Sequence, residues 1–168
     1  MLLFAVLLAV PVVAACGGGD SKPAGKTPVA PEATQTALQT LTIDIDSQSR
    51  ITMSAPVGAA ATVAGKGYRV QAGDGFQIDL TGGPPSIEVT KRDVQANTNA
   101  FKGFIVEDPA GLLWTNQVDG KLQYHFYVVV SALRGFACED TKGPAFTEAQ
   151  ARLMFQACRS VAPAAVPK

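Results

Sequence analysis

The sequence has little of what metal centres and nucleic-acid surfaces are built from. It contains a single histidine, and its 14 basic and 14 acidic residues cancel in charge and make up only 17% of the chain. Neither sign is clustered, so the basic stripe of a nucleic-acid-binding surface is missing. A zinc site needs three or four protein ligands, which one histidine and a pair of joined cysteines do not supply. We therefore expect no nucleic acid among the partners, and no metal ion or other cofactor.

Motifs that would carry catalysis are equally scarce. The chain has no G-x-S-x-G nucleophile elbow, no C-x-x-C pair and, despite glycines at Gly65 and Gly73, no phosphate-binding loop. A serine or cysteine nucleophile would have to use His125 as its base, yet this residue lies in an aromatic and β-branched run typical of a core strand. Asp44 and Asp46 lack the spacing of a calcium loop, so we expect them on the solvent face of a strand. The pattern predicts no catalytic residue.

The first sixteen residues, MLLFAVLLAVPVVAAC, carry the clearest signal in the chain. Residues 2–15 contain no charged or polar side chain, and this run is shorter than the roughly 20 residues that cross a bilayer. Such a length is typical of the hydrophobic core of a signal peptide. Val13-Ala14-Ala15-Cys16 resembles the lipobox of bacterial lipoproteins. The resemblance implies that residues 1–15 are a signal peptide, and that Cys16 carries a diacylglycerol on its sulfur and an acyl chain such as palmitate on its amine.

The same resemblance implies where the protein resides. Two or three acyl chains on Cys16 would hold it stably on a membrane. Gly17 rather than Asp follows the cysteine. This favours an outer membrane facing the periplasm where the organism has two membranes, and the outer face of the membrane where it has one. Since no Lys or Arg precedes Lys22, we expect the basic part of the signal to lie upstream of Met1.

Residues 16–40 are predicted to be the lipidated cysteine and a flexible tether. From Gly17 to Ala37 the chain is rich in Gly, Pro, Ala and Thr and has no aromatic residue. Such a composition does not bury enough apolar surface to fold. A coil of this length spans roughly 25 Å, so the segment sets how far the following domain reaches from the membrane.

Residues 41–163 are predicted to form a single globular domain, followed by a tail at 164–168. Alternating apolar and polar residues predict strands, separated by Gly, Pro and Asp turns. The predicted strands are 41–46, 50–55, 67–72 with a weaker run from Ala59, 76–80, 86–90, 104–107, 112–116 and 121–133. Residues 91–101 are predicted to be a short helix. The last three strands form a meander, and 121–133, apolar on both faces, is expected to be a central strand covered on both sides.

A C-terminal helix completes the predicted domain. Thr147 followed by Gln150 three residues later is a capping box, and Pro163 ends the segment. Its apolar stripe is Leu153, Met154, Ala157, Cys158 and Val161. The fold class is therefore α+β: an antiparallel sheet of about six to eight strands, with the C-terminal helix and one shorter helix packed on one face. This arrangement is faintly similar to sheet-plus-helix envelope lipoproteins of the PsbP/Mog1 type.

Two cysteines remain once Cys16 is assigned to lipid. Cys138 and Cys158 form an even pair in an exported and therefore oxidising setting, which favours a disulfide between helix and sheet. Closing a loop of about 20 residues is worth roughly 3 kcal/mol by the chain-entropy estimate. The alternative is a pair of buried free thiols.

These features favour a lipid-anchored cell-envelope module that binds a partner protein or an apolar ligand without catalysing a reaction. Four residues of the meander form a candidate ligand patch, although aromatic residues in such strands more often belong to the core: Trp114, Tyr124, His125 and Tyr127. The second function class is a hydrolase of unrecognised type that uses His125. In that case His125 should lie in an open cleft within reach of a Ser, Asp or Glu side chain.

Overall fold

The computed structural model describes residues 36–133 and 135–165. The predictions for residues 1–15 and for Cys16 therefore lie outside the described residues. In the described part of the chain, no helix has both the length and the apolar character needed to span a bilayer.

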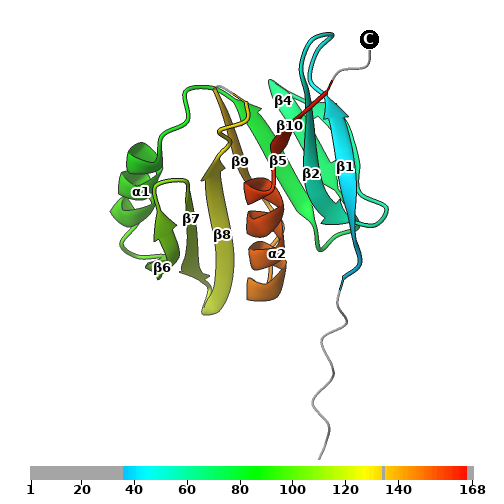
Figure 1. The fold of residues 1–168 in the computed structure, drawn as a ribbon. Coiled ribbons are helices and arrows are strands. Elements are labelled where there is room, and N and C mark those ends of the chain that lie inside the picture. The colour runs from blue at the N-terminus through cyan, green and yellow to red at the C-terminus, as the bar shows by residue number, and fades with distance from the viewer. Residues whose placement is uncertain (1–35, 134, 166–168) are drawn as a thin grey trace, which may run out of the picture. The chain divides into compact units, whose positions relative to one another are not determined.

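The fold class predicted from the sequence is confirmed: the domain is α+β, with antiparallel sheets and two helices (Figure 1). The larger sheet has seven strands, within the predicted range, and a second sheet of three strands was not predicted. The larger sheet contains, in spatial order, β3 (Ala60–Ala64), β4 (Gly67–Gln71), β5 (Gln77–Gly82), β9 (Phe136–Asp140), β8 (Lys121–Val129), β7 (Gly111–Val118) and β6 (Phe101–Asp108). The smaller sheet contains β1 (Leu38–Asp44), β2 (Arg50–Pro56) and β10 (Ala162–Ala164).

The hydrophobic core lies on one face of the seven-stranded sheet, here called the inner face. Alternation along β8 sends Phe126 and Val128 to this face, where both are buried. They share the core with Ile51 and Met53 of β2, and a hydrogen bond 2.7 Å long from the Tyr68 hydroxyl to the Ile45 carbonyl also joins the two sheets. Burial of each large apolar side chain contributes about 1.5–3 kcal/mol, so this shared core holds the two sheets together.

The C-terminal helix α2 (Glu148–Arg159) covers the inner face (Figure 1). The predicted capping box is present, because the Thr147 and Gln150 side chains each accept a hydrogen bond from the other's backbone N–H. Phe155, which the predicted stripe omits, is buried and meets Phe126 edge to face at 6.5 Å between ring centroids. The predicted disulfide is also confirmed: Cys138 of β9 is joined to Cys158, with their Cα atoms 5.8 Å apart.

The prediction of a strand at residues 86–90 is wrong, since these residues begin helix α1 (Ile87–Ala96). The alternating Ile87 and Val89 resemble a strand, but the Ser86 hydroxyl accepts a hydrogen bond from the Val89 N–H and starts a helix. The helix predicted at 91–101 is therefore shifted. It starts four residues earlier and ends at Ala96, and Phe101 belongs to β6.

Other strands differ from prediction mainly at their ends. β1 begins at Leu38, so residues 38–40 belong to the strand, and β8 ends at Val129 rather than Leu133. The weak run from Ala59 is a separate strand, β3, paired with β4 across Gly65. The short strand β10 follows helix α2 and pairs with β2. The sequence did not predict this strand, because Pro163 indicates only that the helix has ended. The predicted meander of β6, β7 and β8 is confirmed by its antiparallel pairing.

Candidate functional site

A large pocket lies on the other face of the seven-stranded sheet, here called the outer face. Helix α1 covers part of this face. It shares the pocket with Trp114 and Tyr127, which alternate along their strands with the inner-face residues Leu113 and Phe126. The prediction that both helices pack on one face is therefore wrong, because α1 and α2 cover opposite faces of the sheet. The volume of the pocket is about 700 Å³. We call it the α1 pocket, and it is lined by Thr90, Asp93, Val94 and Asn97 from the helix and its C-cap and by Trp114, Asn116, Tyr127, Glu139 and Lys142 from the sheet and the segment after β9.

Two polar atoms of the pocket residues are buried without a hydrogen-bond partner. They are the Nε1 of Trp114 and the Oδ1 of Asn116. Both residues belong to β7 and are two positions apart, so their side chains project from the same face. An unpaired buried donor or acceptor costs about 1–3 kcal/mol, and most native ones are paired. One donor and one acceptor of residues that line the same pocket are therefore buried without a partner among the described residues.

His125 lies beside the pocket and supports its floor. It is opposite Trp114 in the β7–β8 register, and the two rings are 5.6 Å apart between centroids. Its Nδ1 is 2.9 Å from Oδ2 of Asp140, whose Oδ1 accepts a hydrogen bond of the same length from the Phe126 backbone N–H. Asp140, the last residue of β9, thus binds both the His125 side chain and the Phe126 backbone of β8. The His125 side chain is 23% exposed, and no serine, threonine or cysteine of the described residues forms a hydrogen bond with it.

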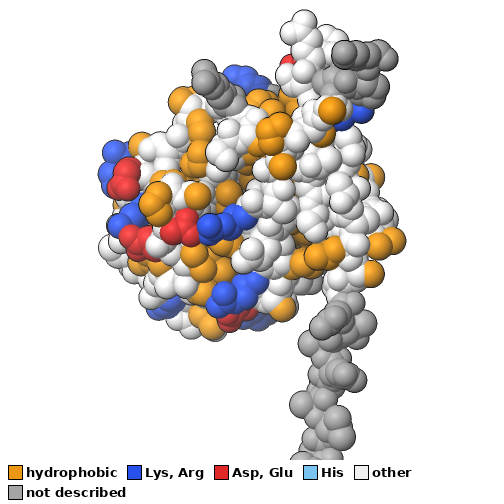
Figure 2. Space-filling model, viewed as in Figure 1, with side chains coloured by type: hydrophobic (Ala, Val, Ile, Leu, Met, Phe, Trp, Pro, Cys, Tyr) orange, Lys and Arg blue, Asp and Glu red, His pale blue; other side chains and the backbone are white. Residues whose placement is uncertain are grey.

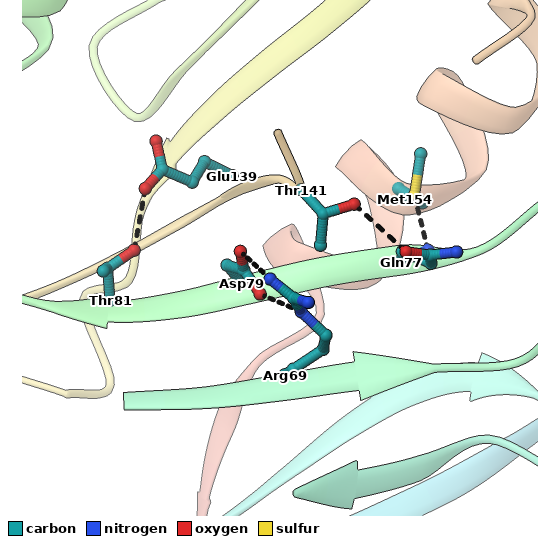
Figure 3. Close-up of polar contacts among 7 residues, drawn as sticks. All are labelled: Arg69, Gln77, Asp79, Thr81, Glu139, Thr141 and Met154. Atoms are coloured by element: carbon teal, nitrogen blue, oxygen red, sulfur yellow. Dashed lines mark hydrogen bonds and ion pairs between the residues drawn. The ribbon is translucent and has the colours of Figure 1, made fainter. Parts of the chain in front are cut away.

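Polar pairs cover the outer face next to the α1 pocket, over β4, β5 and β9 (Figure 3). Arg69 donates two hydrogen bonds to the Asp79 carboxylate, at 2.8 and 2.9 Å, and this contact raises the pKa of Arg69. Thr81 donates to Glu139 at 2.8 Å, which orients the carboxylate of a pocket residue. The polar side chains on this part of the face are paired with one another. The two buried atoms without a partner, on Trp114 and Asn116, both belong to residues of the α1 pocket.

Helix α1 is attached to the sheet less firmly than α2. It has no buried residue, whereas α2 has five. A surface ion pair joins it to β6, between Lys91 and Glu107, and the Glu107 carboxylate raises the pKa of Lys91. Exposed ion pairs contribute little stability. The roof of the pocket is therefore the less stably packed helix of the domain.

The structure distributes the four residues of the predicted patch unevenly. Trp114 and Tyr127 line the same pocket, and His125 stacks on Trp114. Tyr124 packs against the core on the inner face, because it alternates with His125 along β8. The prediction missed Asn116, although alternation along β7 places it on the same face as Trp114. It also missed the four residues of the helix and its C-cap: Thr90 lay in the wrongly predicted strand, and for the other three, within the predicted helix at 91–101, no pattern placed that helix over the sheet.

The fold and the pocket define a disulfide-linked α+β domain with one helix over an outer-face cavity. No protein-family model, no curated protein and no solved structure matches this chain. Its function is therefore argued from the pocket and from the N-terminal sequence.

Proposed function

We propose that this chain is an exported, lipid-anchored binding module of the cell envelope that holds a small ligand in the α1 pocket. The observation that supports a ligand there is the unpaired donor and acceptor of Trp114 and Asn116 next to a 700 Å³ pocket. Ligand sites typically combine apolar and aromatic walls with a few placed polar groups. In the α1 pocket the apolar and aromatic side chains are Val94, Trp114 and Tyr127, and the other six lining residues are polar or charged, so the pocket is more polar than a typical ligand site.

The ligand chemistry follows from these groups. A purely apolar ligand would leave Trp114 Nε1 and Asn116 Oδ1 as they are in the free chain, so it would not gain the roughly 1–3 kcal/mol that pairing each of them contributes. A ligand with an acceptor next to a donor, such as an amide or a hydroxylated ring, pairs both atoms once the Trp114 and Asn116 side chains turn to expose them to the pocket. A flat apolar portion would then lie along the Trp114 and Tyr127 rings. The proposed ligand is amphipathic rather than purely apolar.

The N-terminal sequence supports the proposed location. The apolar run at residues 2–15 and the Val13-Ala14-Ala15-Cys16 sequence are typical of a lipoprotein signal. The lipid on Cys16 would make the membrane itself a partner, facing the periplasm in an organism with two membranes. An envelope protein is the alternative occupant of the pocket surface, and crosslinking in cells with a Cys16→Ser control would identify it.

The His125–Asp140 contact favours one second candidate, a hydrolase with His125 as base. An acidic side chain bonded to Nδ1 is the arrangement that orients a catalytic histidine. If this candidate holds, His125→Gln abolishes turnover of a panel of ester substrates while leaving the fold intact. Turnover that is the same in wild type and His125→Gln would refute it.

Trp114 provides the direct test of the proposed binding, because it is the only tryptophan in the chain. The full chain carrying Cys16→Ser is titrated with a panel of small compounds that place an amide or hydroxyl group on a ring. Binding in the pocket is expected to shift the Trp114 emission and to weaken at least tenfold in Asn116→Val, which corresponds to about 1.4 kcal/mol.

Gln123→Val is the matched control for that experiment. Gln123 is opposite Asn116 in the β7–β8 register and does not line the pocket. The same substitution there should leave the affinity unchanged. Equal affinities in Asn116→Val and Gln123→Val, or no emission shift with any compound, would contradict the proposal.

A further inference from the structure

One end of the domain carries most of its exposed large hydrophobic side chains. Six such side chains are exposed in the described residues, and four of them lie at this end: Leu38, Val57, Val118 and Leu122, with exposed fractions of 53%, 62%, 40% and 53%. Figure 1 shows the start of β1, the end of β2 and the β7–β8 hairpin at the same, lower end of the domain. Figure 2 shows hydrophobic side chains over these regions. We call the four residues the apolar end.

The core does not account for these side chains. In the β7–β8 hairpin Val118 pairs with Lys121, and Leu122 pairs with Gln117, so the two apolar residues project to opposite faces of the sheet. A hairpin that is apolar on both faces at its tip cannot bury both against one core. The other two residues belong to a second tip, where the Val57 N–H donates to the Ala37 carbonyl at 3.0 Å. Each tip projects apolar surface away from the domain.

The described chain also begins at the apolar end. Leu38 opens β1 there, and twenty positions separate Cys16 from Thr36, the first described residue. A coil of that length spans roughly 25 Å. A lipid on Cys16 would therefore keep the apolar end close to the bilayer at an effective concentration in the millimolar range, so that weak contacts suffice for docking.

We infer that the apolar end docks on the surface of the bilayer that holds the anchor, and this inference rests on the proposed lipidation of Cys16. Leu38, Val57, Val118 and Leu122 would enter the headgroup region at two separate tips. Exposed Lys102 and Lys121, next to the hairpin in β6 and β8, would face lipid phosphates. The docking would fix the orientation of the domain, and hence of the α1 pocket, relative to the membrane.

Hydrogen–deuterium exchange tests the docking. The full lipidated chain in vesicles of phosphatidylcholine and phosphatidylglycerol is compared with the soluble Cys16→Ser chain. Docking predicts slower exchange on vesicles around residues 37–40, 56–59 and 117–122. In the double variant Val118→Ser with Leu122→Ser, the protection at 117–122 should be lost. The fold should be unchanged, because both side chains are exposed.

Val63→Ser is the matched control, since Val63 is the most exposed large hydrophobic residue in residues 36–133 and 135–165, at 79%, and lies away from the apolar end. It is in the same cross-sheet row as Val128, through Tyr68, Leu80 and Cys138. That row is seven residues along β8 from Lys121, or roughly 23 Å. Val63→Ser should leave the vesicle-dependent protection intact.

The outcomes separate the docking from the anchor. Flotation of the vesicles in a density gradient shows whether the chain is bound to them. A chain that is bound to the vesicles but shows no protection at the two tips overturns the docking and is consistent with the anchor. A wild-type chain that does not float with the vesicles overturns the proposed anchor, and the docking that rests on it. Protection that survives the hairpin substitutions overturns the assignment of the apolar end as the docking surface.

Discussion

At the scale of single residues, Asp108 has the most contacts to explain. Its Oδ1 accepts hydrogen bonds from the backbone N–H groups of Ala110 and Gly111, at 2.9 and 3.0 Å, and its Oδ2 pairs with Arg159 of α2. The pairing with Arg159, followed by these backbone hydrogen bonds, lowers the pKa of Asp108, and partial burial opposes the shift. One carboxylate thus closes the β6–β7 turn and links it to the end of the C-terminal helix.

Asp108→Ala should lower the free energy of unfolding at neutral pH by about 1–2 kcal/mol, because three hydrogen bonds are lost. The folded pKa lies below the unfolded value of about 3.9, so the charge-dependent part of this contribution is present above about pH 4. It is lost as pH falls through the folded pKa. Urea unfolding of wild type and variant at neutral and acidic pH measures the loss of stability and its dependence on pH. A wild-type-to-variant difference that grows on acidification would contradict this account.

Asn116 has the opposite property, an unpaired oxygen that lowers stability. We expect Asn116→Val to raise the free energy of unfolding by about 1 kcal/mol, because it removes the unpaired acceptor and places a β-branched residue in a strand. Thermal or urea unfolding of the ligand-free chain provides the measurement. If Asn116→Val lowers stability, the oxygen has a partner and the argument for the pocket fails.

At the scale of elements, α2 and its disulfide determine how firmly the inner face is covered. Replacing both Cys138 and Cys158 by Ala should cost about 3 kcal/mol, the chain-entropy value for a loop of 20 residues. The reduced wild-type protein should lose a similar amount. Denaturant unfolding with and without reductant measures the loss, and equal midpoints in both conditions would show that the bond contributes no stability.

The two helices differ in how well the sequence predicts them. For α2, the capping box at Thr147 and Gln150 and a stripe with helical spacing agree, and both are present in the structure. For α1, Ile87 and Val89 alternate as in a strand, while the Ser86 cap indicates a helix. Local hydrogen bonding at the cap overrides a two-residue alternation that is too short to determine secondary structure.

The pocket could be predicted only in part. Trp114 and Tyr127 follow from strand alternation, and both line it. The helix predicted at 91–101 covers three of the four roof residues, but the place of α1 on the outer face depends on tertiary packing that no local pattern encodes. Asn116 is ordinary in sequence, and its unpaired oxygen becomes apparent only in the folded structure.

At the scale of the whole molecule, the proposed anchor determines where the protein resides. Cys16→Ser should move the protein from the membrane fraction to the soluble envelope fraction, because the acyl chains are the proposed membrane attachment. Cell fractionation followed by intact-mass measurement tests both location and lipid. An unmodified Cys16 in the membrane-bound protein would contradict the lipobox interpretation.

The central claim is that the α1 pocket holds an amphipathic ligand paired to Trp114 and Asn116, and native mass spectrometry tests it most directly. The Cys16→Ser chain is recovered from the envelope of its own cells, alongside the same chain with Asn116→Val or Gln123→Val. The account predicts a bound small molecule on the parent chain and on Gln123→Val, and its loss from Asn116→Val. A parent chain without bound mass, or equal retention by Asn116→Val, would contradict it.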